Sequence, residues 1–248
     1  MKPSVREPSG ARHWWSRLLD VVYPGVCHLC GEGLSHGGAL CPPCAEELPG
    51  LERPFCETCG EQFEGEIDAV FKCPNCSDQK FFFEFARPAL VRSAGTMTMV
   101  HDLKYARRLE LAGALAELTE RAFDDPRLAA VLDERWPLVP VPLHRARRRW
   151  RHFNQASEVA LPLGRAVGLP VVEALKRIRP TVTQTRLSRS QRQKNLRGAF
   201  EVVRGFDPGP GVVLVDDVFT TGSTVNECAR VLKKFGVQKV VVVTVMRG

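Results

Sequence analysis

Eight of the nine cysteines lie within residues 27–76, where they form four C-x-x-C pairs. Two thiolates at this spacing can bind one metal ion, because a turn through the two intervening residues directs both sulfur atoms to the same side. The pairs also repeat: C-x-x-C-G-E begins at Cys27 and at Cys56, and C-P-x-C begins at Cys41 and at Cys73. A duplicated unit of about thirty residues is too short to bury a core, so we expect a tetrahedral ion to hold each copy together.

The cysteine pattern therefore predicts two structural zinc sites with four thiolates each. The repeat favours sequential ligand sets, with Cys27, Cys30, Cys41 and Cys44 around one ion and Cys56, Cys59, Cys73 and Cys76 around the other. An interleaved, cross-braced arrangement stays open. Disulfides would need an oxidising compartment, and a thioredoxin-like redox site would need one C-x-x-C beside a βαβ unit rather than four. The remote Cys228 lies in a helical pattern and is expected in the core.

A second group of candidate site residues follows an apolar run near the C-terminus. Residues 212–215 are Val-Val-Leu-Val, and Asp216 and Asp217 come directly after them. A loop then precedes a helical pattern, and it contains Thr220, Thr221, Gly222, Ser223 and Thr224. Hydroxyls at a helix N-terminus suit a phosphate group, and the paired carboxylates suit vicinal hydroxyls or hydrated Mg²⁺. Because the loop has no lysine, a nucleoside triphosphatase P-loop is disfavoured. Helix N-capping alone would account for the hydroxyls but not for the adjacent aspartates.

Positive charge is concentrated in residues 142–198, which contain fourteen lysines and arginines against two acidic residues. Such a segment is expected to face an anionic partner. Its densest part contains Arg145, Arg147, Arg148, Arg149 and Arg151, with Trp150 and Phe153 among them. These arginines suit a pyrophosphate, and together with the aromatic rings they equally suit a nucleic-acid strand. A solvated basic face is the third interpretation.

The surrounding pattern predicts how these residues are positioned. Residues 211–216 and 239–246 have the continuous apolar character of strands buried on both faces, and residues 222–235 between them have a helical pattern. This order forms a βαβ unit, so we expect a parallel sheet with ligands bound at the carboxyl ends of its strands. Further upstream, residues 81–91 and 138–143 have strand character, and residues 96–123 and 154–168 have helical character.

The composition is that of a globular protein. The chain has 248 residues, of which 44% are hydrophobic and 25% are charged, and this balance excludes a largely disordered chain. No apolar stretch is long enough to span a bilayer, and residues 1–12 lack the apolar core of a signal peptide. We therefore expect a cytoplasmic protein without membrane insertion.

Residues 212–224 resemble the motif with which type I phosphoribosyltransferases bind 5-phosphoribosyl 1-pyrophosphate (PRPP). Further segments narrow the resemblance to the ComF family, which is associated with natural competence and DNA uptake; they are residues 18–24, 103–105, 141–143, 151–155 and 184–195. The resemblance implies an α/β, type I phosphoribosyltransferase-like domain with a parallel sheet (residues 81–248). It also implies a preceding double zinc ribbon (residues 25–80). Residues 1–24 are expected to form an N-terminal tail with an amphipathic helix, because Trp14, Trp15, Leu18, Leu19 and Val22 lie at helical spacing.

By this resemblance, Asp216 and Asp217 hold the ribose hydroxyls of PRPP, residues 220–224 surround its 5′-phosphate, and Mg²⁺ accompanies it. The loop after Pro142 faces the pyrophosphate or a nucleic acid with Arg145, Arg147, Arg148, Arg149, Arg151, Asn154 and Gln155. A flexible loop closes over the site and contains Arg186, Arg189, Arg192, Lys194 and Asn195. His152 stands where the family usually has glycine. Thr220 stands where 6-oxopurine salvage enzymes carry an aspartate base, which argues against that activity.

The resemblance implies a PRPP-binding protein that acts in competence-related uptake or handling of single-stranded DNA, with proteins of the competence machinery as further candidate partners. The alternative is a metabolic phosphoribosyltransferase of nucleotide or cofactor salvage whose zinc domain is purely structural. Phosphoribosyl transfer passes through a transition state with oxocarbenium character at ribose C1, so positioning, Mg²⁺ and cations can suffice without a nucleophile. Whether the protein turns over PRPP, or only binds it or a related ribose phosphate, stays open at this point.

Overall fold

The computed structural model describes residues 25–34, 38–63, 65, 70–180, 191, 195–207 and 209–248. The chain forms two compact units, Met1–Glu47 and Leu48–Gly248. The first unit holds the first two cysteine pairs and helix α2 (Pro42–Glu47). The second holds the other two pairs, α3 (Pro74–Ser77) and every strand of the described residues. The expected N-terminal amphipathic helix lies outside the described residues. The domain boundaries after residues 24 and 80 stay predictions.

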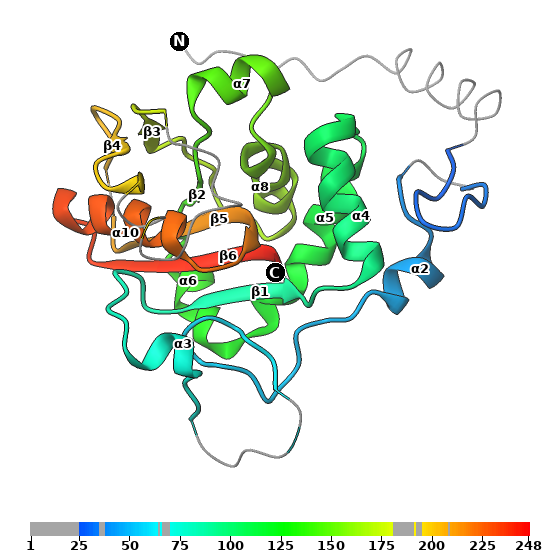
Figure 1. Cartoon of the computed structure of the whole chain (residues 1–248), viewed down its shortest axis with the longest axis horizontal. Helices are drawn as coiled ribbons and strands as arrows, with labels where there is room; N and C mark the ends of the chain where they lie inside the picture. The colour runs from blue at the N-terminus through cyan, green and yellow to red at the C-terminus, as the bar shows by residue number, and fades with distance from the viewer. Residues whose placement is uncertain are drawn as a thin grey trace, which may run out of the picture. The chain divides into compact units, whose positions relative to one another are not determined.

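A parallel sheet of four strands lies at the centre of the second unit, in the order β1–β6–β5–β2 (Figure 1). All neighbouring strands are parallel, and they are β1 (Ala86–Leu90), β6 (Lys239–Arg247), β5 (Gly211–Phe219) and β2 (Leu138–Pro140). The predicted parallel α/β fold is therefore confirmed. β5 is longer than predicted because residues 218 and 219 continue to pair with β6. Asp216 and Asp217 thus lie inside the last part of the strand rather than beyond its end.

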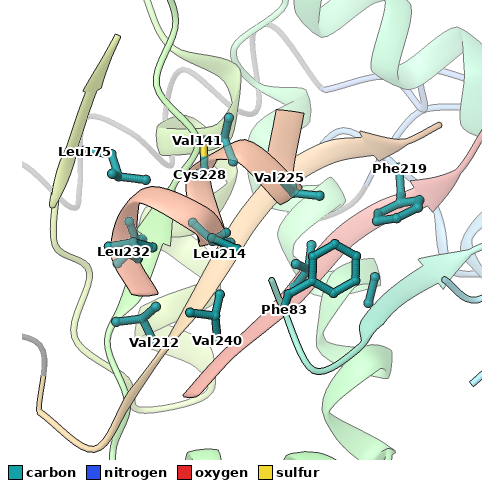
Figure 2. Packing of buried hydrophobic residues seen from close by; sticks show 14 of the residues in the cluster. Phe83, Val141, Leu175, Val212, Leu214, Phe219, Val225, Cys228, Leu232 and Val240 are labelled. Atoms are coloured by element: carbon teal, nitrogen blue, oxygen red, sulfur yellow. The ribbon is translucent and has the colours of Figure 1, made fainter. Parts of the chain in front are cut away.

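Helices cover both faces of this sheet. Helix α10 (Ser223–Phe235) packs on one face, where Cys228 and Leu232 lie in one apolar cluster with Val212 and Leu214 (Figure 2). Cys228 is fully buried there, as predicted. Helices α5 (Leu111–Glu120) and α8 (Gln155–Ala166) pack against each other and against the strands. Because side chains alternate along a strand, residues such as Val213 face this second layer, and they are equally buried.

The helical pattern of residues 96–123 is divided in the structure. Helix α4 (Ala94–His101) leads into a π-helical turn, η1 (Asp102–Ala106), and Arg107 then has a left-handed φ of 57° before α5 begins. Two short 3₁₀ helices and a helix follow α5, namely η2 (Arg121–Asp124), η3 (Pro126–Leu128) and α6 (Ala129–Asp133). Single π turns often occur at functional sites, and this one contains Lys104 and Tyr105.

The segment after β2 is not a plain loop. Residues 145–151 form helix α7 (Arg145–Arg151), which begins where the His144 ring accepts a hydrogen bond from the Ala146 N–H (3.3 Å). The helix ends at His152, whose φ of 71° is the left-handed conformation that glycine adopts easily. A separate antiparallel pair consists of β3 (Leu175–Arg177) and β4 (Phe200–Val202). None of the helices in the described part of the chain has the length and apolar character that a bilayer crossing requires.

Candidate functional site

Each set of four cysteines brings its sulfur atoms together in the predicted sequential arrangement. Within each set all four Sγ atoms lie within 4.8 Å of one another, and the sets are Cys27, Cys30, Cys41 and Cys44, and Cys56, Cys59, Cys73 and Cys76. The separations from Cys30 to Cys41 (3.7 Å) and from Cys59 to Cys73 (3.6 Å) are close to the edge of a sulfur tetrahedron around zinc, about 3.8 Å for Zn–S distances of about 2.3 Å. The residues therefore fit two Cys₄ zinc sites.

The backbone of the two zinc sites repeats as well. In both, the N–H of the first cysteine donates to the carbonyl five residues later, at 2.7 and 2.8 Å. In both, the N–H of the third ligand donates to the sulfur of the first, at 3.4 and 3.3 Å. Gly31 and Gly60 follow the C-x-x-C pairs with φ of 78° and 68°, the left-handed backbone that this turn needs. The sequence duplication is thus a structural duplication.

The two aspartates of β5 have different surroundings. Asp217 is only 5% exposed, accepts a hydrogen bond from the Val218 N–H (2.9 Å) and forms an ion pair with Lys104. Asp216 is half-buried, accepts a hydrogen bond from the Asp217 N–H (2.9 Å) and lines a cavity of about 370 Å³, which we call the first cavity. Burial raises the pKa of Asp216 to about 6, although the positive charges of Lys104 and Arg177 act in the opposite direction.

The hydroxyl loop runs directly from β5 into α10. Gly222 has a φ of 71°, and a side chain there would meet the Phe219 ring at 2.5 Å, so glycine is required at this turn. The hydroxyls of Thr221 and Ser223 are 2.9 Å apart. Residues 220–224 line a recess of about 30 Å³ that also borders Asp216. The first N–H groups of a helix lack intrahelical acceptors, so this recess can bind an anionic group such as a phosphate.

Six of the seven residues expected to face pyrophosphate or nucleic acid divide between two cavities. The first cavity is lined by Arg147, Arg151 and Gln155, together with Asp216, Asp217 and Thr224. A second cavity of about 220 Å³ is lined by Arg145, Arg148 and Asn154. The two cavities share Pro142, Leu143 and Arg177 as lining residues. Arg149 is exposed and lines neither of them.

Arg151 is a buried cation of the first cavity. It is 7% exposed, donates to the Gln155 Oε1 atom (2.8 Å), and its guanidinium lies 5.2 Å from the centre of the Tyr105 ring. Its Nε is buried without a hydrogen-bond partner in the described part of the chain. A buried guanidinium with an unused donor is well suited to an anionic ligand.

Two further cations, Lys104 and Arg177, lie near the aspartates. Neither was among the site residues predicted from the sequence. Burial lowers the pKa of Lys104 to about 8, while the charge of Asp216 raises it. Arg177, at the end of β3, is 7% exposed and lines both cavities. Lys104 stands in one of the family segments, which is a usable signal. For Arg177 the only signal is its membership of the basic segment.

Arg247 of β6 links the second zinc ribbon to Phe219, the residue before the hydroxyl loop. Arg247 donates to the Phe219 carbonyl (2.8 Å), and its guanidinium lies 5.5 Å from the centre of the Phe219 ring. The same guanidinium forms an ion pair with Glu61, two residues after the zinc ligand Cys59. Phe83 meets the Phe219 ring edge-on at 6.0 Å. A short chain of contacts therefore links the second zinc site to the loop.

The expected flexible loop is only partly within the described residues. Arg186, Arg189, Arg192 and Lys194 lie outside them. Asn195 is described, is partly buried and lines neither the first nor the second cavity. Its role stays a prediction.

Comparison with known proteins defines the class of the protein. Residues 18–79 match the double zinc ribbon domain, and residues 155–248 match the phosphoribosyl transferase domain. The chain thus joins a double zinc ribbon to an α/β domain of the phosphoribosyltransferase type, as its motifs predict.

Two relatives cover most of the chain. Competence protein F of Haemophilus influenzae is 30% identical over 211 residues, which are 81% of this chain and 87% of that protein. DNA utilization protein YhgH of Salmonella typhimurium is 32% identical over 226 residues, 90% of this chain and 91% of that protein. Competence protein ComFC of Bacillus subtilis is 29% identical over 106 residues, 42% of this chain and 41% of its own. The chain belongs to the ComF family.

Proposed function

We propose that this protein binds PRPP, or a closely related ribose phosphate, in the first cavity. The observation that carries the proposal is that Asp216 borders both the first cavity, with its arginines, and the recess of the hydroxyl loop. PRPP carries a 5′-phosphate, vicinal hydroxyls and a pyrophosphate. A helix N-terminus can bind the phosphate, carboxylates can accept from the hydroxyls, and cations can pair with the pyrophosphate. These three features are adjacent here in the same order.

In this proposal each group of PRPP has its own contacts. The 5′-phosphate occupies the recess of residues 220–224, the ribose hydroxyls donate to Asp216 and Asp217, and the pyrophosphate lies against Arg147 and Arg151. A half-buried carboxylate that borders a polar cavity fits a hydrated Mg²⁺ ion, and Asp216 is such a group. When bound, Mg²⁺ supplies positive charge that neutralises the pyrophosphate.

Titration with the two halves of PRPP tests these contacts. Arg147→Ala should weaken PRPP and inorganic pyrophosphate about tenfold and leave ribose 5-phosphate unchanged, because Arg147 borders only the arginine side of the cavity. Thr220→Val is the converse variant and should weaken PRPP and ribose 5-phosphate but not pyrophosphate. Equal losses for all three ligands in both variants would contradict the assignment.

We also propose that the exposed surface of helix α7, which carries Arg149 and Trp150, handles single-stranded DNA. The relatives carry names that refer to competence and DNA utilization, Arg149 is exposed, and Trp150 is 57% exposed beside it. Binding of a single-stranded oligonucleotide should weaken steeply with salt. Arg149→Ala should make the log–log salt slope shallower by about 0.7, and Trp150→Ala should lower affinity at least about fivefold without changing that slope. Failure to bind any single strand at about 50 mM salt would remove this part of the proposal.

A metabolic phosphoribosyltransferase is the second candidate, and a third cavity favours it. This cavity of about 260 Å³ lies on the β6 side of the aspartates, and its mostly apolar lining includes Met97, Tyr105, Val218, Thr220 and Met246. A flat heterocyclic acceptor placed there would adjoin the ribose. Pyrophosphate release from PRPP on addition of a purine or pyrimidine base would support turnover, whereas PRPP that stays intact with all bases would support binding alone.

A further inference from the structure

Helix α7 presents its arginines to two different cavities. Arg147 and Arg151, four residues apart, line the first cavity, and Arg145 and Arg148, three residues apart, line the second. PRPP in the first cavity leaves the second pair of arginines without a ligand. Neither Arg145 nor Arg148 takes part in an ion pair among the described residues. Two of the cations that line the second cavity are therefore without an ion pair in the described part of the chain.

Asn154 and Glu173 contribute hydrogen-bond acceptors to the lining of the second cavity; Asn154 is buried and Glu173 is exposed. Asn154 is 8% exposed, and its Nδ2 donates to the Val141 carbonyl (3.1 Å) and to the Ser157 hydroxyl (2.9 Å). That hydroxyl donates onward to the Glu173 Oε1 atom (3.2 Å). The Val141 carbonyl can only accept, so the orientation of the Asn154 amide is fixed. Its Oδ1 is buried and has no hydrogen-bond partner in the described part of the chain.

A ligand of this cavity needs an anionic end for Arg145 and Arg148 and a hydrogen-bond donor for the acceptors of Asn154 and Glu173. A bare phosphate or sulfate would leave the Asn154 Oδ1 atom unsatisfied and would be repelled by the Glu173 carboxylate. Lys176 lines the cavity too, but it is already paired with Glu201 at 3.1 Å. The arrangement thus selects a molecule with a phosphate at one end and an amino group at the other.

We infer that the second cavity binds one nucleotide whose base carries an exocyclic amino group, as cytosine does. Its phosphate pairs with Arg145 and Arg148, and its amino group donates to Asn154 Oδ1 and to Glu173. The volume of about 220 Å³ has room for one base. The inference rests on the proposed role in handling single-stranded DNA, because a strand supplies such nucleotides. A free nucleotide offers the same chemistry.

Fluorescence anisotropy of the full chain with an oligonucleotide of deoxycytidine and one of deoxythymidine, equal in length, tests the base contacts. We expect wild-type protein to bind the deoxycytidine strand at least about fivefold more tightly, because thymine presents an acceptor where cytosine presents its amino group. Glu173→Gln should reduce this preference, since a glutamine amide can turn a donor toward thymine. Glu173 does not line the PRPP cavity, so this variant should leave PRPP affinity unchanged.

The phosphate contacts are tested by two variants on the same helix. Arg145→Ala with Arg148→Ala should weaken both oligonucleotides about tenfold and leave PRPP affinity unchanged. Arg147→Ala is the matched control and should weaken PRPP while both oligonucleotides bind as before. Arg145 and Arg148 are exposed, so their removal is not expected to disturb folding.

Equal affinity of wild-type protein for the two oligonucleotides would overturn the inference, and so would unchanged oligonucleotide binding by the Arg145/Arg148 variant. Both results would leave PRPP binding and DNA binding in general intact. Deoxycytidine 5′-monophosphate distinguishes the two sources of the ligand. If this mononucleotide competes with the deoxycytidine strand, the cavity takes a free nucleotide. If it does not compete and the preference for the deoxycytidine strand persists, the cavity takes a nucleotide of the strand. If wild-type protein showed the base preference but did not bind PRPP, that result would contradict the proposed PRPP site and not this inference.

Discussion

At the scale of single residues, Asp216 joins the two parts of the proposed binding site at a cost to folding. Its carboxylate is partly removed from water, and this desolvation raises its pKa to about 6 from the ordinary 3.8. The neighbouring Asp217 is compensated by its ion pair with Lys104. The pKa of Asp216 stays raised despite the nearby cations, and Asp216 is the aspartate that borders both the cavity and the recess, which is typical of a ligand-binding group.

We predict that Asp216→Asn stabilises the protein at neutral pH. Because the folded-state pKa lies above the unfolded value, the folded state binds the proton more tightly, and stability falls as pH rises from about 4 to about 6. Asparagine removes this loss, so the free energy of unfolding above pH 6 should increase by roughly 1–3 kcal/mol. Thermal midpoints of both proteins, measured from pH 5 to pH 8, check this. A lower midpoint for the variant throughout that range would contradict it.

Local sequence motifs predicted some of the residues around the first cavity. Others could not be predicted, because contacts between residues far apart in the sequence place them there. The aspartates and the hydroxyl loop are contiguous in sequence, so their adjacency could be predicted. The pairing of Lys104 with Asp217 joins residues that are far apart in sequence, and only the π turn after α4 brings the amine to β5. His152 could be noted as a departure from glycine, and the structure shows that it adopts the glycine-like φ.

At the scale of elements, helix α7 directs the arginines of the densest part of the basic segment to two cavities. The sequence predicted an arginine-rich loop, in which no arginine has a defined direction. As a helix the same residues separate onto two faces, since positions three or four apart lie on the same side. Arginine and alanine favour helix formation, so the composition of residues 145–151 was a usable signal for α7.

A second prediction concerns the contact between the zinc ribbon and the hydroxyl loop. Glu61→Gln weakens the ion pair with Arg247, which holds the Phe219 carbonyl and ring. The Glu61 side chain is 39% exposed, so the effect should be modest, a loss in PRPP affinity of up to about fivefold. The amides of residues 219–223 should also exchange with solvent several-fold faster, as measured by hydrogen exchange.

The matched control is Glu57→Gln in the same ribbon. Glu57 pairs with Arg127 (2.6 Å) and Arg53 (2.5 Å), neither of which touches the hydroxyl loop through a described hydrogen bond. This variant should leave PRPP affinity and exchange of the loop amides unchanged. Identical behaviour of the two variants would show that the ribbon does not position the loop through Glu61.

At the scale of the whole molecule, the two zinc sites belong to different compact units. The cysteine spacing predicted the ligand sets, because each set is local in sequence. It could not predict that the second site shares a unit with the sheet, since this depends on contacts such as those of Arg127 with Glu57 and of Arg247 with Glu61.

This division leads to a third prediction. Wild-type protein should contain close to two zinc ions, and Cys41→Ser and Cys56→Ser should each contain close to one. Cys41→Ser should keep its PRPP affinity because its site lies in the first unit. Cys56→Ser should bind PRPP more weakly, by up to about fivefold, because its site supports the loop through Glu61. Metal analysis and PRPP titration check both variants, and equal PRPP affinities would contradict the division of roles.

The central claim is that the carboxyl end of β5 binds PRPP, and calorimetric titration of the full chain with PRPP and Mg²⁺ tests it most directly. The pH should be well above the Asp216 pKa of about 6, so that the carboxylate is ionised. The account predicts one PRPP bound per chain and at least tenfold weaker binding by Asp216→Asn, which stays folded. Absence of binding by wild-type protein, or equal affinity of the two proteins, would contradict it.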